Sequence, residues 1–296
     1  MDITNEAPDI RSVESDLIVP PMISGQPALG KRVRQTIPEY RDTHVYHTLY
    51  LPSNWSSDRK YPLLVEFAGN GPYQNKYGDI SSGHTEDSKL GFGISAGRNF
   101  IWLCLPYLNN LGTANVTQWW GNKPDYHVEP TLDYCKNAVP WVCQNYSGNP
   151  NAVVLTGFSR GAIACNYLGL YDDEISTLWA AFIPYSHYDG VIETWSYPAN
   201  DRPSALTRLN RLKNRPQFIC HETTDSQRIG LADTKHYLDS TGIQAHFKFM
   251  ETGFRNHNDA WVLRPCPTRT VLRQWLQSIL TMSLTELPDF GTYNWI

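Results

Sequence analysis

Hydrophobic and polar residues are arranged along the chain in a pattern that predicts strands separated by helices. Residues 31–37 and 43–51 alternate between polar and apolar or aromatic side chains, as paired antiparallel strands do. Beyond them the apolar residues form short continuous runs, which are typical of parallel strands buried on both faces. These runs occupy residues 63–69, 100–107, 152–157, 178–185, 216–222 and 243–251.

Segments with the apolar spacing of helices lie between or after these strands. They cover residues 127–146, 160–170, 204–214, 226–242 and 268–284. We expect Pro140 to kink or break the first of them, because proline has no N–H and its ring crowds the preceding turn. The alternation predicts an α/β fold with a mostly parallel, twisted sheet of about eight strands and helices on both faces.

The polar and irregular stretches suggest how the domain is organised. Residues 1–30 are rich in proline, serine and acidic residues and have little periodicity, so we expect an N-terminal arm that wraps around the fold. Residues 31–296 are then a single domain with loop insertions at about 70–99 and 107–127. Both insertions follow strands, and they should emerge on the sheet edge where open α/β folds bind ligands.

Composition excludes several classes of function. The net charge is −4, and basic residues form only short clusters, so we expect no nucleic-acid partner. No segment reaches the roughly 18–20 apolar residues of a membrane span. The chain starts with acidic and polar residues, unlike a secretion signal. We therefore expect either an intracellular protein or an exported one whose leader this sequence lacks. The oligomeric state stays open.

The six cysteines fit no metal-binding spacing, and no His, Asp and Glu cluster does either, so we expect neither a metal nor a cofactor. Three of the cysteines lie in apolar runs and are expected to be buried: Cys104, Cys165 and Cys220. The other three could form a disulfide in an oxidising compartment, with a pairing that the sequence does not determine: Cys135, Cys143 and Cys266.

A candidate nucleophile lies where one apolar strand ends and a helix of small residues begins. Residues 157–161 read Gly-Phe-Ser-Arg-Gly, which matches the G-x-S-x-G pattern of a nucleophile elbow. A serine on so sharp a turn needs small neighbours, because a Cβ there would collide with the adjacent strand or helix. The helix starting at Arg160 would direct free N–H groups towards Ser159. The alternative is an ordinary tight turn.

With this motif in its strand–turn–helix context, the chain resembles the α/β-hydrolase superfamily. Within it, the chain is similar to serine esterases of the dienelactone hydrolase, polyhydroxybutyrate depolymerase and feruloyl esterase type. The resemblance covers roughly residues 45–280 in element order. It implies the α/β-hydrolase fold and hydrolysis of carboxylic esters through a Ser-His-Asp triad and an acyl-enzyme. The chain order of the triad is serine, acid, histidine.

Candidates for the other two triad members follow the later strands. Asp225 lies where the family has its acid, and Glu222, closer to the strand end, is the rival. Either carboxylate could instead cap the helix that follows. His257 lies in the polar loop after the last strand. It is the histidine among nine that combines this loop position with the expected order.

The oxyanion hole departs from the family pattern. Relatives often have a His-Gly pair after the third strand, whereas residues 67–71 read Phe-Ala-Gly-Asn-Gly here. Ala68 therefore replaces a side chain that usually braces the loop. We expect the N–H of Gly69 or Asn70 to act with that of Arg160 as oxyanion donors.

Aromatic residues in the second insertion suggest a substrate surface. Trp119 and Trp120 would lie at the pocket rim, as a platform for a sugar or an aromatic acyl group or as packing anchors of the loop itself. His187 follows another strand and could line the same pocket. We expect the substrate to be a small-molecule ester or a carbohydrate ester. Esters of carbohydrates or of phenolic acids are the favoured classes. The alternatives are a prolyl-oligopeptidase-like serine peptidase and a non-catalytic binding protein on this fold.

Overall fold

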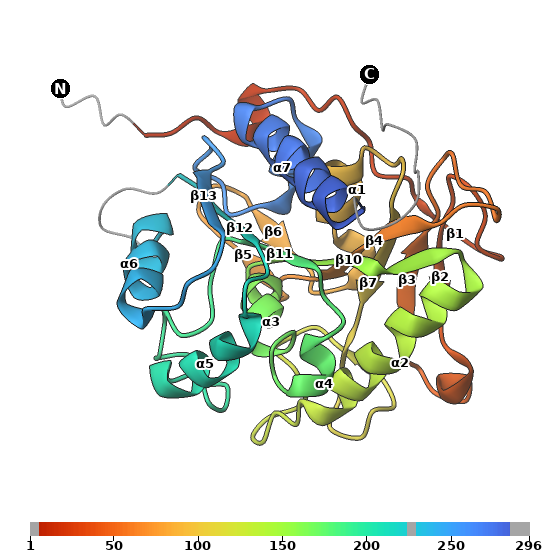
Figure 1. Cartoon of the computed structure of the whole chain (residues 1–296), viewed down its shortest axis with the longest axis horizontal. Helices are drawn as coiled ribbons and strands as arrows, with labels where there is room; N and C mark the ends of the chain where they lie inside the picture. The colour runs from red at the N-terminus through yellow and green to blue at the C-terminus, as the bar shows by residue number, and fades with distance from the viewer. Residues whose placement is uncertain (1–5, 224–228, 285–296) are drawn as a thin grey trace.

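In a computed structural model that describes residues 6–223 and 229–284, a nine-stranded sheet forms the centre of the molecule (Figure 1). The expectation was about eight strands, and β1 is a two-residue strand at the sheet edge. From edge to edge the strands are β1 (Met22–Ile23), β2 (Arg32–Gln35), β3 (His47–Tyr50), β7 (Ile101–Leu105), β4 (Tyr61–Phe67), β10 (Gly148–Phe158), β11 (Ala181–Tyr185), β12 (Gln217–His221) and β13 (Phe247–Glu251).

Strand direction agrees with the sequence pattern. The strand β3 is antiparallel to both β2 and β7. The other neighbouring strands of this sheet pair in parallel. The alternating segments near the N-terminus therefore form the antiparallel part, and the continuous apolar runs form the parallel part.

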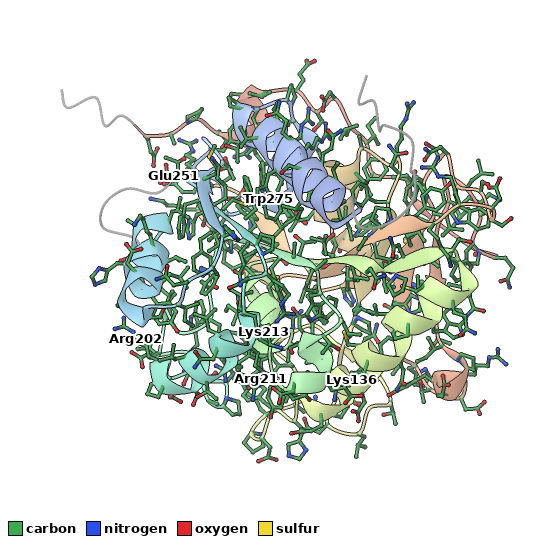
Figure 2. The ribbon with its side chains drawn as sticks, in the orientation of Figure 1. Lys136, Arg202, Arg211, Lys213, Glu251 and Trp275 are labelled. Carbon is green, nitrogen blue, oxygen red and sulfur yellow. The ribbon has the colours of Figure 1, made fainter. Side chains whose placement is uncertain are left out.

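Helices cover both faces of the sheet (Figure 1). One face carries α1 (Leu90–Ser95) and α7 (Pro267–Leu284). The other carries α2 (Glu129–Asn145), α3 (Arg160–Tyr167), α4 (Asp173–Ser176), α5 (Arg202–Leu209) and α6 (Leu231–Thr241). Trp275 of α7 packs on the sheet with its ring 5.4 Å from that of Phe218 (Figure 2). On the opposite face Lys136 of α2 bridges to Asp172 and Glu174 at α4 (Figure 2).

Two hydrophobic cores result, one on each face. Successive strand side chains point to opposite faces, so Leu63 and Val65 join the core beneath α2 and α3. Leu64, between them, joins the core beneath α1 and α7. Burying one such side chain stabilises the fold by about 1.5–3 kcal/mol. Because both faces are covered, β4 must be apolar at nearly every position.

The break that Pro140 could have caused does not occur, since α2 continues through it to Asn145. Pro140 lies on the exposed side of the helix. The carbonyl that loses its hydrogen bond is therefore on the solvent side, where water can solvate it.

Both predicted insertions contain short elements. The first includes the hairpin of β5 (Tyr73–Gln74) and β6 (Ile80–Ser81), then the 3₁₀ helix η3 (Thr85–Asp87). The second includes the hairpin of β8 (Tyr107–Leu108) and β9 (Asn115–Val116). The remaining 3₁₀ helices are η1 (Ile10–Ser12), η2 (Pro38–Tyr40), η4 (Asn210–Leu212) and η5 (Asp259–Leu263).

The six cysteines are free, and Cys104, Cys165 and Cys220 are buried as expected. Cys135 and Cys143 are buried too, whereas Cys266 is partly exposed. Over residues 6–223 and 229–284, no helix combines the length and the apolar character needed to cross a bilayer.

Candidate active site

The candidate residues gather where the parallel strands end. Ser159 follows β10, Ser186 follows β11, Glu222 follows β12 and the loop with His257 follows β13. The segment with Gly69 and Asn70 follows β4. Carboxyl ends of parallel strands meet at one edge of a sheet, which is where open α/β folds bind their ligands.

Ser159 lies on a strained turn between β10 and α3, with φ of 55° and ψ of −114°. Its neighbours must lack a side chain for steric reasons. A Cβ at Gly157 would lie 2.2 Å from the Gly161 carbonyl oxygen. A Cβ at Gly161 would lie 1.9 Å from the Phe67 carbonyl oxygen. The strain and the two close approaches are those expected of a nucleophile elbow.

His257 links Ser159 to a carboxylate. Its Nε2 lies 3.0 Å from the Ser159 Oγ, and its Nδ1 lies 2.8 Å from Oε1 of Glu222. The Ser186 Oγ also lies 2.8 Å from Nδ1. The hydroxyl, imidazole and carboxylate thus form one hydrogen-bonded chain, which is the arrangement that activates a serine hydroxyl.

Glu222 is buried among histidines. Burial by itself raises the pKa of this carboxyl, but the imidazoles of His257 and His221 outweigh it, so the pKa lies below its usual range. The ionised form is therefore favoured beside His257. An ionised carboxylate there can stabilise a positive imidazole.

Asp225, the acid that the family resemblance implies, lies outside the described residues. The rival, Glu222, directly follows the last residue of β12, His221. Its carboxylate therefore starts at the sheet edge and reaches the imidazole without an intervening loop.

Asp79 holds the loop that carries His257, although no pattern in the sequence points to it. Its buried carboxylate accepts hydrogen bonds from the His257 N–H at 3.1 Å and the Asn256 side-chain amide at 2.8 Å. Asp79 belongs to the first insertion, between β5 and β6. Nothing in the local sequence distinguishes it from a surface aspartate.

Residues of the N-terminal arm contact the same loop. Asn256 Oδ1 accepts from the Ile10 N–H at 2.8 Å, and the Pro8 carbonyl accepts from the Arg255 N–H at 3.1 Å. The Arg255 guanidinium pairs with Glu6 at 2.9 Å. The arm thus contacts the two residues that precede the imidazole.

Replacing Asp79 with alanine is expected to lower turnover by about 10–100-fold, because His257 loses the anchor of its backbone while its side chain stays intact. The loss of these hydrogen bonds should also destabilise the fold by about 1–3 kcal/mol. Steady-state kinetics and urea unfolding test this. The matched control is Asp87→Ala. Asp87 is an exposed residue of the same insertion, and its carboxylate bonds Ser82 and not the His257 loop. Equal turnover in wild type and Asp79→Ala would contradict the expectation.

The candidate oxyanion donors have no backbone partners in the described residues. The N–H groups of Gly69 and Asn70 make none of the hydrogen bonds found between described residues outside helices and strands. Arg160 is the first residue of α3, so its N–H has no partner within the helix. Three N–H groups are therefore available near the elbow.

The predicted rim residues differ in exposure. Trp120 is fully buried and stacks on Tyr167 with ring centroids 4.4 Å apart, so it packs the loop and offers no platform. Trp119 is half-buried and its ring lies 5.7 Å from that of Trp195. His187 is half-buried as well. Its ring centroid lies 4.9 Å from that of Trp195 and 5.2 Å from that of His257.

His187 lies beside the imidazole of His257, and its surroundings set its own protonation state. Burial lowers its pKa, and the neighbouring His257 lowers it further. A neutral imidazole is therefore expected there at neutral pH. Trp195, which completes the contact between His187 and Trp119, was not found from the sequence because it lies in a polar segment without periodicity.

No protein-family model matches the chain. A curated relative, carboxylesterase 1F of Mus musculus, is 25% identical over 197 residues, which are 58% of this chain. The chain spans 32% of the length of that relative.

Solved structures match over most of the chain. The feruloyl esterase module of Clostridium thermocellum in complex with sinapinate has a TM-score of 0.53 at 15% identity, covering 95% of this chain and 99% of that one. This chain has the α/β-hydrolase fold. A putative dipeptidyl aminopeptidase IV of Bacteroides ovatus has a TM-score of 0.53 at 13% identity, covering 84% of this chain and 35% of that one. The α/β-hydrolase fold inferred from the elbow and the element order is confirmed.

Over residues 6–223 and 229–284, no group of three or more His, Cys, Asp or Glu side chains is arranged to hold a metal ion. The imidazoles near Glu222 are instead spaced as aromatic neighbours, with the ring centroids of His187 and His221 6.2 Å apart.

Proposed function

We propose that this protein is a serine hydrolase that cleaves carboxylic esters through an acyl-enzyme. The observation that carries the proposal is the hydrogen-bonded chain of Ser159, His257 and Glu222, with separations of 3.0 Å and 2.8 Å. The similarity to a mouse carboxylesterase and to esterase structures supports the same class of reaction.

The first half-reaction acylates the serine. His257 Nδ1–H donates to Glu222, which leaves Nε2 as the acceptor for the Ser159 proton. As Oγ attacks the ester carbonyl, the proton moves to Nε2, and the carboxylate stabilises the imidazolium. The negative oxygen of the tetrahedral intermediate is received by the N–H of Arg160 with that of Gly69 or Asn70.

His257 completes the acylation by giving its proton to the leaving alcohol oxygen as the ester C–O bond breaks. The second half-reaction frees the enzyme. A water molecule then loses a proton to the same Nε2 and attacks the acyl carbon, and Ser159 leaves with that proton. Every step is carried by side chains and backbone groups of this chain, and the mechanism needs no cofactor.

The experiment that tests the class compares esters with amides. Purified protein should hydrolyse p-nitrophenyl acetate and leave peptide p-nitroanilides uncut. Hydrolysis of prolyl peptides instead would favour the peptidase alternative, to which the partial match with the dipeptidyl aminopeptidase gives its support. Folded protein with no activity on either class would favour a binding protein on this fold.

For the substrate, we propose a phenolic or carbohydrate ester with a ring near the scissile bond. His187, Trp195 and Trp119 form a continuous half-buried aromatic wall that starts beside His257. Flat apolar faces suit aryl rings and the apolar faces of sugars. The sinapinate bound to the Clostridium thermocellum feruloyl esterase module is consistent with the phenolic choice.

Trp195→Ala is expected to raise KM for methyl ferulate or for an acetylated xylo-oligosaccharide about 10-fold, because one ring contact is worth roughly 1–1.5 kcal/mol. KM for p-nitrophenyl acetate should change less. Trp275→Ala is the control, since this half-buried tryptophan packs α7 on the sheet (Figure 2). Equal changes for all esters would contradict the assignment. The ester whose KM responds identifies the ring class.

A further inference from the structure

The Arg160 side chain has a role that the proposed mechanism does not use. It is 1% exposed and follows the nucleophile, and its guanidinium donates to backbone carbonyls. Its Nη1 donates to the Trp119 carbonyl at 2.5 Å, and its Nη2 donates to the Gly69 carbonyl at 2.8 Å. One guanidinium therefore joins the elbow to two loops that come from separate insertions.

The segment after β4 is held at two successive carbonyls. The Tyr107 hydroxyl donates to the Ala68 carbonyl at 3.0 Å, next to the bond from Arg160 to Gly69. The guanidinium itself lies 3.7 Å above the Tyr107 ring. Arg160 and Tyr107 thus form one stacked unit that fixes both peptide groups of the segment.

Fixing these carbonyls also fixes the candidate oxyanion donors. A trans peptide is planar, and its N–H points opposite to its C=O. The bond to the Ala68 carbonyl therefore directs the Gly69 N–H, and the bond to the Gly69 carbonyl directs the Asn70 N–H. Asn70 is held a second time, because its Oδ1 accepts from the Trp119 N–H at 2.8 Å.

The buried charge adds an electrostatic contribution. Burial lowers the pKa of Arg160 to about 10, so the guanidinium stays positive at neutral pH. A cation behind the Gly69 carbonyl favours negative charge developing on the far side of the same peptide. A neutral side chain of similar length could keep the packing but not this charge.

We propose that the Arg160 guanidinium is the positioning residue of the oxyanion hole and replaces the brace that Ala68 cannot supply. This inference rests on the proposed function, because it assumes an oxyanion formed by attack of Ser159. The Arg160 side chain acts through the N–H groups of Gly69 and Asn70 and does not touch the substrate, whereas the backbone N–H of the same residue remains a donor.

The chain offers a closely matched control in Arg32. Its side chain is equally buried, lies 4.2 Å above the Trp102 ring, and donates to the backbone carbonyls of Glu86 and Thr85. Arg32 and Arg160 thus share burial, an aromatic neighbour and carbonyl partners. Arg32 contacts neither the elbow nor the segment after β4.

The test compares Arg160→Gln, Arg160→Lys and Arg32→Gln. For Arg160→Gln we expect kcat on p-nitrophenyl acetate to fall about 100-fold with KM within about threefold. The Ki of phenylboronic acid, whose serine adduct is tetrahedral and negative, should rise by a similar factor. Arg160→Lys should lie between, since lysine keeps the charge but lacks the planar fork. Arg32→Gln should lower the melting temperature but keep kcat and Ki.

Each result decides one question. Unchanged kcat and Ki in both Arg160 variants, or an equal loss in Arg32→Gln, would overturn the positioning role. If Arg160→Gln does not fold, Arg160→Lys and its Ki carry the test alone. Wild-type protein that neither hydrolyses esters nor binds the boronic acid would overturn the proposed function first, and this inference with it.

Discussion

Ser159→Ala is expected to lower ester turnover at least about 10⁴-fold and to abolish covalent labelling by a fluorophosphonate. The probe reacts when a serine Oγ attacks phosphorus and fluoride leaves. Among the described serines, Ser159 has its hydroxyl beside His257 Nε2, at 3.0 Å, on a turn strained to positive φ. Removing the Oγ takes away the nucleophile and leaves the imidazole and the carboxylate in place.

A second serine provides the control for this experiment. The Ser186 Oγ bonds the same imidazole at the opposite nitrogen, Nδ1, at 2.8 Å. Ser186→Ala should therefore keep labelling at Ser159 and lose less than about 10-fold in turnover, as the removal of one of two bonds to Nδ1. Peptide mapping of the labelled protein identifies the modified residue. Labelling that survives in Ser159→Ala would refute the nucleophile assignment.

Glu222→Gln is expected to lower kcat by about 10³–10⁴-fold, whereas Asp225→Asn should stay within about threefold of wild type. The Glu222 carboxylate bonds Nδ1 of His257, and this bond selects the tautomer that leaves Nε2 free to accept the serine proton. A glutamine amide keeps the size but can present an N–H to Nδ1, which favours the opposite tautomer.

The comparison of the two acidic residues is informative in either direction. Both variants are measured on p-nitrophenyl acetate, with circular dichroism to verify folding. A larger loss in Asp225→Asn than in Glu222→Gln would make Asp225 the acid of the triad. Similar losses in both would mean that the two carboxylates act on the same imidazole.

Glu222 should also leave a signature in stability. Its pKa in the folded protein is lowered from 4.5, chiefly because the imidazoles outweigh burial. A group of this kind stabilises the fold above its unfolded pKa, and the contribution is lost as the pH falls through the folded pKa. The unfolding free energy of Glu222→Gln should therefore depend less on pH below 4.5 than that of wild type. Urea unfolding at a series of acid pH values measures this.

Much of the fold could be read from periodicity. Continuous apolar runs predicted the parallel strands, because a strand covered on both faces has no solvent side to mark with polar residues. The expectation at Pro140 came from local chemistry, since a proline within a helix removes one N–H and its ring crowds the preceding turn. The exposed side of α2 tolerates it.

Site residues could be predicted only where the local sequence determines the backbone geometry around them. The elbow could be recognised because steric crowding requires glycine at two fixed positions around the serine, which produces a five-residue pattern. The local sequence could not show that Trp120 is buried while Trp119 is partly exposed. Adjacent residues have similar local contexts, and only packing against Tyr167 buries one of them.

The sequence by itself indicated the candidate nucleophile, the candidate histidine and their order, because each lies in a local context whose chemistry is visible along the chain. The tertiary structure alone decided which buried groups support them. It brought the Glu222 carboxylate to His257, and Asp79 to the same loop from 178 positions away in the chain. It also set the Arg160 side chain behind Gly69, 91 positions away. Such partners are chosen by proximity in space, and a hydrogen bond between distant segments leaves no periodic trace in either of them.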